Sequence, residues 1–113
     1  MAIQIYHNPR CSKSRATLAL LAEQGIEPEI IEYLNDPPSE TTLKQIQRAL
    51  GCAVTDMVRK KEVPYAENGL ESASEDGLIT AIIKFPILLE RPIVVNGNRA
   101  AIGRPPENVL DIL

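Results

Sequence analysis

The chain has 113 residues, which suffices for one domain with a modest hydrophobic core. Apolar residues make up 44% of the sequence and charged residues 24%, as in ordinary globular proteins, whereas aromatic residues make up only 4%. The core must therefore consist mainly of aliphatic side chains. The formal net charge of -3 argues against nucleic acid or an anionic membrane as the main partner.

The N-terminal residues lack the basic and long apolar regions of a signal peptide, and no apolar run is long enough for a transmembrane helix. A cytoplasmic location is therefore expected, in which Cys11 and Cys52 rest as thiols. They form no CxxC pair, and two thiols with a single histidine are a poor ligand set for zinc. No metal site is expected.

In chain order, the first predicted element is a strand over residues 2–6, where isoleucines alternate with other residues. Residues 7–10 include an Asn-Pro turn signal that ends this strand. A helical pattern rich in Ala and Leu follows over residues 12–24, and Gly25 is a suitable stop. A second strand is predicted over residues 29–34.

Three helices are predicted in the middle of the chain. The first has Ser39 as its N-cap, runs to Leu50 and is closed by Gly51. The second is short, covers residues 56–60 and follows Thr55 as a cap. Residues 63–65, which include a proline, are expected to interrupt the helical pattern. The third helix begins after Ser74 and ends at about Lys84, before Pro86.

The C-terminal part predicts a strand over residues 93–95, a hairpin turn at Asn96-Gly97 and a returning strand over Arg99–Ile102. A last short helix is expected from Pro105-Pro106 to Leu113. The first strand–helix–strand unit predicts a parallel pair with a right-handed crossover, and the last two strands an antiparallel hairpin. The fold class is therefore α/β, with a mixed four-stranded sheet and a helical insertion between strands 2 and 3. This element order matches the thioredoxin-like fold.

Cys11 lies between a strand-ending loop and the start of a helix. Free backbone N–H groups and the helix dipole favour a thiolate there, and can lower a cysteine pKa from ~8.5 to ~3.5–7.5. The same N–H groups form a site for a tetrahedral oxyanion. Polar and basic side chains surround the position: His7, Arg10, Ser12, Lys13, Ser14 and Arg15. Free cysteines are often buried packing residues, but such a segment is hard to bury, so a nucleophile is favoured.

Another cysteine-based oxyanion site is excluded by spacing. Low-molecular-weight tyrosine phosphatases, and the arsenate reductases built on that fold, use a Cys-x5-Arg loop. Here the position of that arginine is occupied by Thr17, and Arg15 would close a shorter loop. The phosphatase loop is therefore absent.

Several segments together resemble the ArsC-like proteins, the glutaredoxin-coupled arsenate reductases: residues 5–15, 33–38, 58–60, 64–65, 86–88, 91–95 and 103–105. Each fragment alone would be weak, but the combination is specific and spans nearly the whole chain. The resemblance implies the thioredoxin-like fold and a single domain over residues 1–113. It also implies that the proline at position 92 follows a cis peptide bond.

The resemblance further implies the site and its chemistry. Cys11 would be the catalytic nucleophile, and Arg59, Arg91 and Arg104 would bind the substrate oxyanion, for which the planar guanidinium is well suited. Supporting roles are expected for His7, Ser14 and Arg15. The implied reaction reduces arsenate to arsenite, with glutathione as co-substrate, glutaredoxin as partner and no bound cofactor. Cys52 is interpreted as a packing residue.

Two other functions remain open at this point. One is a general glutathione-linked thiol oxidoreductase on the same fold. The other is a non-catalytic regulator that binds RNA polymerase, like the Spx-type proteins, although these carry a CxxC whose second position is Ser14 here. The sequence also has Ser12-Lys13 where well-studied ArsC members have Gly-Thr, which adds charge beside Cys11.

Overall fold

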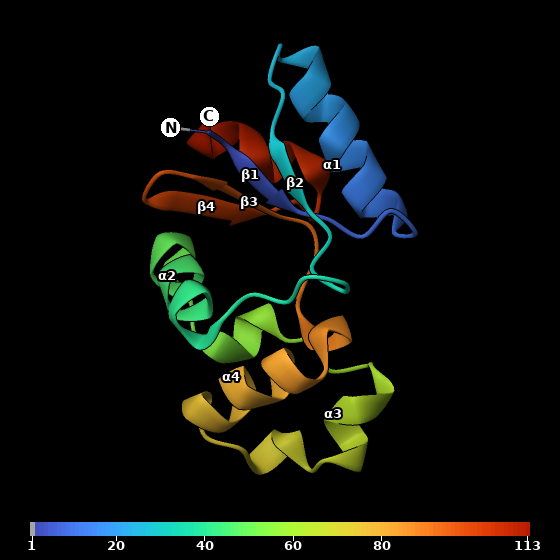
Figure 1. The fold of residues 1–113 in the computed structure, drawn as a ribbon, viewed down its shortest axis with the longest axis vertical. Helices are drawn as coiled ribbons and strands as arrows, with labels where there is room; N and C mark the ends of the chain where they lie inside the picture. Colours follow the sequence, from blue (N-terminus) through green and yellow to red (C-terminus); the bar gives the residue numbers. More distant parts are fainter. Residues whose placement is uncertain (1) are drawn as a thin grey trace. The chain divides into compact units, whose positions relative to one another are not determined.

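The computed structural model describes residues 2–113. Its contacts group into two compact units (Figure 1). The sheet unit consists of the residues up to Asp36 together with Arg91–Leu113, and the helical unit consists of Pro37–Glu90. The expectation of a single domain over the whole chain stays a prediction.

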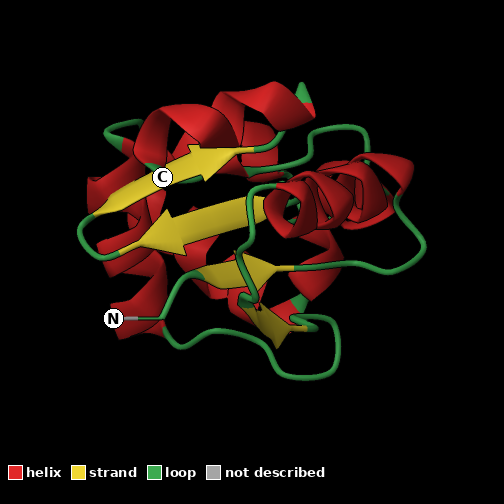
Figure 2. Ribbon diagram, turned by 90° about the horizontal axis from the view of Figure 1, so that it is seen from above, coloured by secondary structure: helices red, strands yellow, loops and turns green. Residues whose placement is uncertain are grey.

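The sheet unit contains a mixed four-stranded sheet in the order β2-β1-β3-β4. Its strands are β1 (Gln4–Tyr6), β2 (Glu29–Ile31), β3 (Ile93–Asn96) and β4 (Arg99–Ile102). β1 and β2 are parallel and are connected through helix α1 (Ser12–Glu23), whereas β3 runs antiparallel to both β1 and β4. In Figure 2 the strands lie side by side, and the two longest arrows point in opposite directions. The predicted α/β architecture is confirmed.

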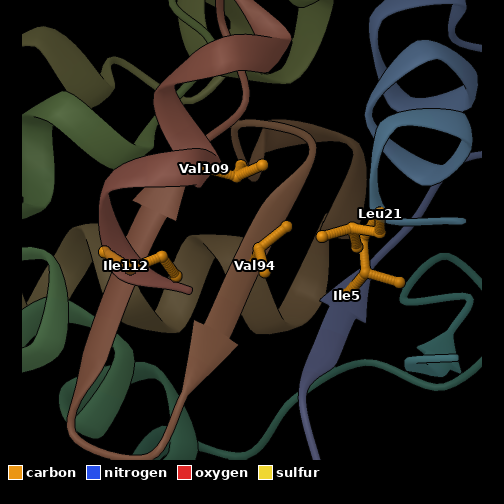
Figure 3. Close-up of a cluster of buried hydrophobic side chains, with 5 residues drawn as sticks. All are labelled: Ile5, Leu21, Val94, Val109 and Ile112. Atoms are coloured by element: carbon orange, nitrogen blue, oxygen red, sulfur yellow. The ribbon is translucent and has the colours of Figure 1, made fainter. Parts of the chain in front are cut away.

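One face of this sheet is covered by α1 and by the C-terminal 3-10 helix η4 (Pro106–Ile112), which contact each other. Ile5 and Val94 are opposite each other in neighbouring strands and are fully buried. Figure 3 shows their side chains pointing toward those of the two helices. The cluster consists of Ile5, Leu21, Val94, Val109 and Ile112. Because all five are aliphatic, the core is of the kind that the low aromatic content predicts.

The helical unit contains α2 (Glu40–Leu50), α3 (Val63–Glu67) and α4 (Glu75–Lys84). Short 3-10 helices lie between and after them: η1 (Val54–Met57), η2 (Leu70–Ser72) and η3 (Pro86–Leu88). Two of the predicted caps are confirmed, because Ser39 accepts a hydrogen bond from the Thr42 N–H and Ser74 accepts one from the Gly77 N–H. None of the helices within residues 2–113 combines the length and apolar character needed to cross a bilayer.

Two expectations for the helical unit were wrong. Val63–Glu67 forms α3, where an interruption was predicted, because Pro64 lies in its first turn, where a missing N–H costs nothing. The predicted helix over 56–60 is instead the 3-10 helix η1, and Thr55 does not cap it. The helical conformation ends at Met57, and Val58 is extended because it pairs with Leu89 in an isolated antiparallel bridge.

In the sheet unit, several boundaries differ from expectation. β1 begins at Gln4 and not at residue 2, and the last helix is the 3-10 helix η4. The hairpin loop is Gly97-Asn98, one residue later than predicted, because Asn96 pairs with Arg99 inside the ladder. Gly97 adopts the positive φ of 65° at the first loop position, so neither Asn96 nor Asn98 has to adopt a positive φ. β2 ends at Ile31 rather than at residue 34, because the chain turns there: the Asn35 N–H donates to the Glu32 carbonyl.

Candidate active site

The sheet topology places three chain segments at the same end of the strands. Tyr6 at the end of β1 pairs with Ile93 at the start of β3, and Ile93 pairs with Ile102 at the end of β4. Since β3 is antiparallel to both neighbours, the segment after β1, the segment before β3 and the segment after β4 all lie at this end of the sheet. Residues far apart in sequence are thereby brought together.

Cys11 lies in the first of these segments and is the N-cap of α1, in an extended conformation with φ -92° and ψ 123°. Its N–H donates to the Asn8 carbonyl at 3.0 Å, and its carbonyl accepts from the Arg15 N–H at 3.0 Å. As a thiol it makes no side-chain capping hydrogen bond, in contrast to Ser39 and Ser74 at the starts of α2 and α4. The first N–H groups of α1 therefore remain available for a thiolate or an oxyanion.

The surroundings of Cys11 stabilise its charged form. Burial by itself would raise the pKa of the thiol, but the Ser14 N–H, a hydrogen bond from the Arg91 side chain, the Lys13 N–H and the charge of Arg104 together outweigh it. The pKa of Cys11 is therefore lowered from its ordinary value of 9.0. Because the thiolate is the nucleophile, this shift increases the reactive fraction at neutral pH.

Arg104 connects two of the predicted site residues. Its Nη2 donates to the Cys11 Sγ at 3.4 Å, and its Nε donates to the Arg91 carbonyl at 2.7 Å. Its own carbonyl accepts a hydrogen bond from Asn108 Nδ2 at 3.0 Å. The guanidinium is thus held in place beside the sulfur. The Arg91-Pro92 bond is cis, as expected, and Arg104-Pro105 is also cis, which the sequence did not indicate.

His7 and Ser14 form a buried hydrogen-bonded pair, with 2.6 Å between His7 Nδ1 and Ser14 Oγ. The Asn8 N–H donates to the same hydroxyl at 3.1 Å, so Ser14 Oγ is hydrogen-bonded to both His7 and Asn8. Asn8 also accepts a hydrogen bond from the Arg10 N–H through Oδ1. Asn8 was not predicted as a site residue, although the Asn-Pro turn signal marked its position. The pair fixes the loop and the first turn of α1 against each other.

Arg15 and Arg59 have other partners. Arg15 Nη1 donates to the Pro9 carbonyl at 3.0 Å, so this arginine stabilises the loop before Cys11. Arg59 lies in the helical unit, where its Nη1 forms an ion pair with Glu90 Oε1 at 3.0 Å. Its contribution to oxyanion binding stays a prediction. Among residues 2–113, no group of three or more His, Cys, Asp or Glu residues could hold a metal ion.

Cys52 differs from Cys11 in its electrostatic environment. It lies in the helical unit, where burial, and to a smaller degree Asp56, raises the pKa of its thiol above 9.0. Gln47 Nε2 donates to its backbone carbonyl at 3.3 Å. Cys52 is therefore a thiol at neutral pH and a poor nucleophile, in line with its interpretation as a packing residue.

The pKa of His7 is expected to lie below 6.5. Burial lowers it, Glu32 raises it to a smaller degree, and Arg15 lowers it further. The folded state then favours neutral His7, so the unfolded state takes up the proton first as pH falls below 6.5, and the free energy of unfolding decreases. The chain has one histidine, so an NMR titration of its ring protons is unambiguous. A pKa at or above 6.5 would contradict the buried, neutral state.

Comparisons with known proteins identify the family of the chain. The family model described as the ArsC family matches residues 6–112. A protein of Neisseria meningitidis serogroup A, named arsenate reductase, is 49% identical over 98% of this chain and 97% of its own length. YfgD of Escherichia coli K12, whose function is uncharacterised, is 50% identical over 98% of this chain and 96% of its own length.

Solved structures support the same assignment. The structure of arsenate reductase from Vibrio cholerae is 51% identical and has a TM-score of 0.97, covering 100% of this chain and 98% of that one. The thioredoxin-like fold with its mixed sheet is shared with these relatives. Family match, identity and fold together show that the chain belongs to the ArsC family.

Proposed function

We propose that this protein is an arsenate reductase in which Cys11 is the nucleophile and Arg91 and Arg104 bind the oxyanion. The observation that carries the proposal is the 3.4 Å hydrogen bond from Arg104 Nη2 to the Cys11 sulfur at the start of α1. A nucleophile, a fixed guanidinium and free helix N–H groups coincide there, which suits a small tetrahedral anion. Relatives that match 98% and 100% of this chain are named arsenate reductase.

In the first step the Cys11 thiolate attacks arsenic. An S–As bond forms and an As–O bond breaks, and the oxygen leaves as water after taking up protons. Negative charge shifts onto the remaining oxygens, where Arg91 and Arg104 stabilise it. The resemblance assigns Arg59 to the same role, and its Nε is buried and makes no hydrogen bond, so it has donor capacity beyond the ion pair with Glu90.

The remaining steps need external thiols. Glutathione displaces a second arsenic-bound oxygen as water and forms a second S–As bond. A glutaredoxin thiolate then attacks the glutathione sulfur, and the electron pair of that S–As bond stays on arsenic, which is reduced from As(V) to As(III). The product is a glutaredoxin–glutathione mixed disulfide. Water hydrolyses the last S–As bond, so that arsenite leaves and the Cys11 thiol is restored.

External thiols are proposed because the chain offers no suitable internal one. The second position of a CxxC motif is occupied by Ser14, whose hydroxyl is already bonded to His7. Cys52 has a raised pKa and is a weak attacking group. The protein itself then needs no bound cofactor for the reaction.

A steady-state arsenate assay tests the proposal. Arsenite formation should require the protein, glutathione and glutaredoxin together, and omission of glutaredoxin should reduce it to near background. A glutathionylated peptide is the comparison substrate, because a general thiol oxidoreductase would reduce it efficiently. Turnover of the peptide without turnover of arsenate would replace the proposed function with that alternative. Specific capture of RNA polymerase, without either turnover, would favour a regulator.

A further inference from the structure

Gly103 is a buried residue between the end of β4 and Arg104, at a place where a side chain has no room. A Cβ at this position would lie 2.5 Å from Thr17 Oγ1 and 2.8 Å from Pro92 Cγ. Both distances are far below the ~3.5–4 Å of ordinary van der Waals contact. Its φ is not positive, so this glycine is needed for space and not for its backbone conformation.

Thr17 and Pro92, the residues that a Cβ at position 103 would meet, cannot move easily. Thr17 is fully buried, and its hydroxyl donates to the Lys13 carbonyl at 2.8 Å, in the first turn of α1. Pro92 is buried, and its carbonyl accepts the Gly103 N–H at 2.9 Å. A buried side chain in a close-packed interior moves only together with its surroundings. A larger residue at position 103 would therefore push β4 away from α1 and from the start of β3.

Gly103 directly precedes Arg104, whose guanidinium donates hydrogen bonds to the Arg91 carbonyl and to the Cys11 sulfur. We infer that Gly103 is a positioning residue: the absence of a side chain there lets the chain after β4 approach α1 closely enough for Arg104 to reach Cys11. The effect of Gly103 on catalysis rests on the proposed function, whereas its effect on the position of Arg104 does not.

The test measures the pKa of Cys11 in Gly103→Ala, from the pH dependence of alkylation by iodoacetamide. Cys52→Ser serves as the common background, so that one thiol reacts. The pKa of Cys11 should rise by roughly one unit or more, the size expected when a neighbouring opposite charge withdraws. In the arsenate assay, KM should rise roughly tenfold, as for loss of a charged contact. An unchanged pKa in the folded variant would overturn the inference.

Ile112→Ala is the control for a loss of stability that does not involve position 103. It leaves a cavity in the hydrophobic cluster of the sheet unit, near the C-terminal end of η4. This variant should lower the melting temperature without moving the pKa of Cys11. An equal pKa rise in Ile112→Ala would show that the shift only reports loosened packing, and would also overturn the inference.

The double variant Gly103→Ala/Thr17→Ala removes the two Thr17 atoms that a Cβ at position 103 would meet and keeps the 2.8 Å approach to Pro92 Cγ, so the rescue should be partial. Thr17→Ala alone is the reference for the double variant. The Cys11 pKa of the double variant should lie closer to that reference, and should be lower than the Cys11 pKa of Gly103→Ala. If Gly103→Ala does not fold, the double variant decides: a folded protein with a low Cys11 pKa supports the inference. Failure of the double variant to fold, or a Cys11 pKa as high as in the single variant, contradicts it. Because alkylation needs no arsenate, these outcomes stay distinct from a failure of the proposed function.

Discussion

Replacing Cys11 with serine is expected to lower kcat for arsenate reduction by roughly 10³-fold or more, because a hydroxyl is a far weaker nucleophile than a thiolate. The environment that lowers the pKa of the thiol cannot compensate for that difference at neutral pH. Arsenite formation with glutathione and glutaredoxin measures the effect. Arsenate binding should persist in Cys11→Ser, because the arginines and the helix N–H groups that the serine does not cap are unchanged.

Cys52→Ser is the matched control, and it should keep most of the activity. The Cys11→Ser protein should also stay folded, since serine is a preferred N-cap and can accept the hydrogen bond that Cys11 does not. Thermal unfolding of both variants checks this point. Substantial arsenate turnover by Cys11→Ser would reject Cys11 as the nucleophile, and loss of turnover in Cys52→Ser would reveal an internal disulfide relay.

Replacing Arg104 with glutamine should reduce kcat/KM for arsenate by roughly 100-fold, the typical effect of removing one preorganised donor at a developing negative charge. The substitution removes the charge beside the Cys11 sulfur and the donor to the Arg91 carbonyl. The pKa of Cys11 should therefore rise by about one unit in the free protein. Steady-state kinetics and iodoacetamide alkylation measure the two effects separately.

Arg99→Gln is the control for Arg104→Gln. Arg99 lies in β4 of the same unit and is exposed, and its guanidinium donates to the Asp111 carbonyl. It carries the same charge but does not contact the cysteine, so its replacement should leave activity and the pKa of Cys11 nearly unchanged. Equal effects of the two variants would mean that net charge, and not the geometry around Cys11, governs the reaction.

The parts of the fold that follow from local chemistry were predictable from the sequence. Ser39 and Ser74 mark helix starts because a hydroxyl satisfies a free N–H, and Gly51 marks a helix end because it adopts the left-handed conformation, with φ 67°. The parallel first pair and the antiparallel second pair follow from the connection lengths alone. Cys11 as the reactive position follows from its place at a helix start within a polar segment.

The parts that depend on tertiary contacts were not predictable from local patterns. Pro64 is compatible both with an interruption and with a helical first turn, and only packing decides between them. Gly103 acts through contacts with Thr17 and Pro92, which its neighbours in sequence do not indicate. Asn8 lies in the predicted turn, but its hydrogen bond to Ser14 depends on how the loop folds against α1. Arg91 and Arg104 were assigned by resemblance, since an isolated arginine is most often a surface residue; the structure brings both to Cys11.

The hydrogen bond between Arg104 and Cys11 joins residues that are 93 positions apart. A ribosome therefore synthesises the cysteine long before the arginine that stabilises its thiolate. A nascent chain lacks the contribution of Arg104 to the thiolate until β4 and the residues after it are added and fold back onto the sheet. The full reactivity of Cys11 is thus a property of the folded sheet unit and not of the segment around the cysteine alone.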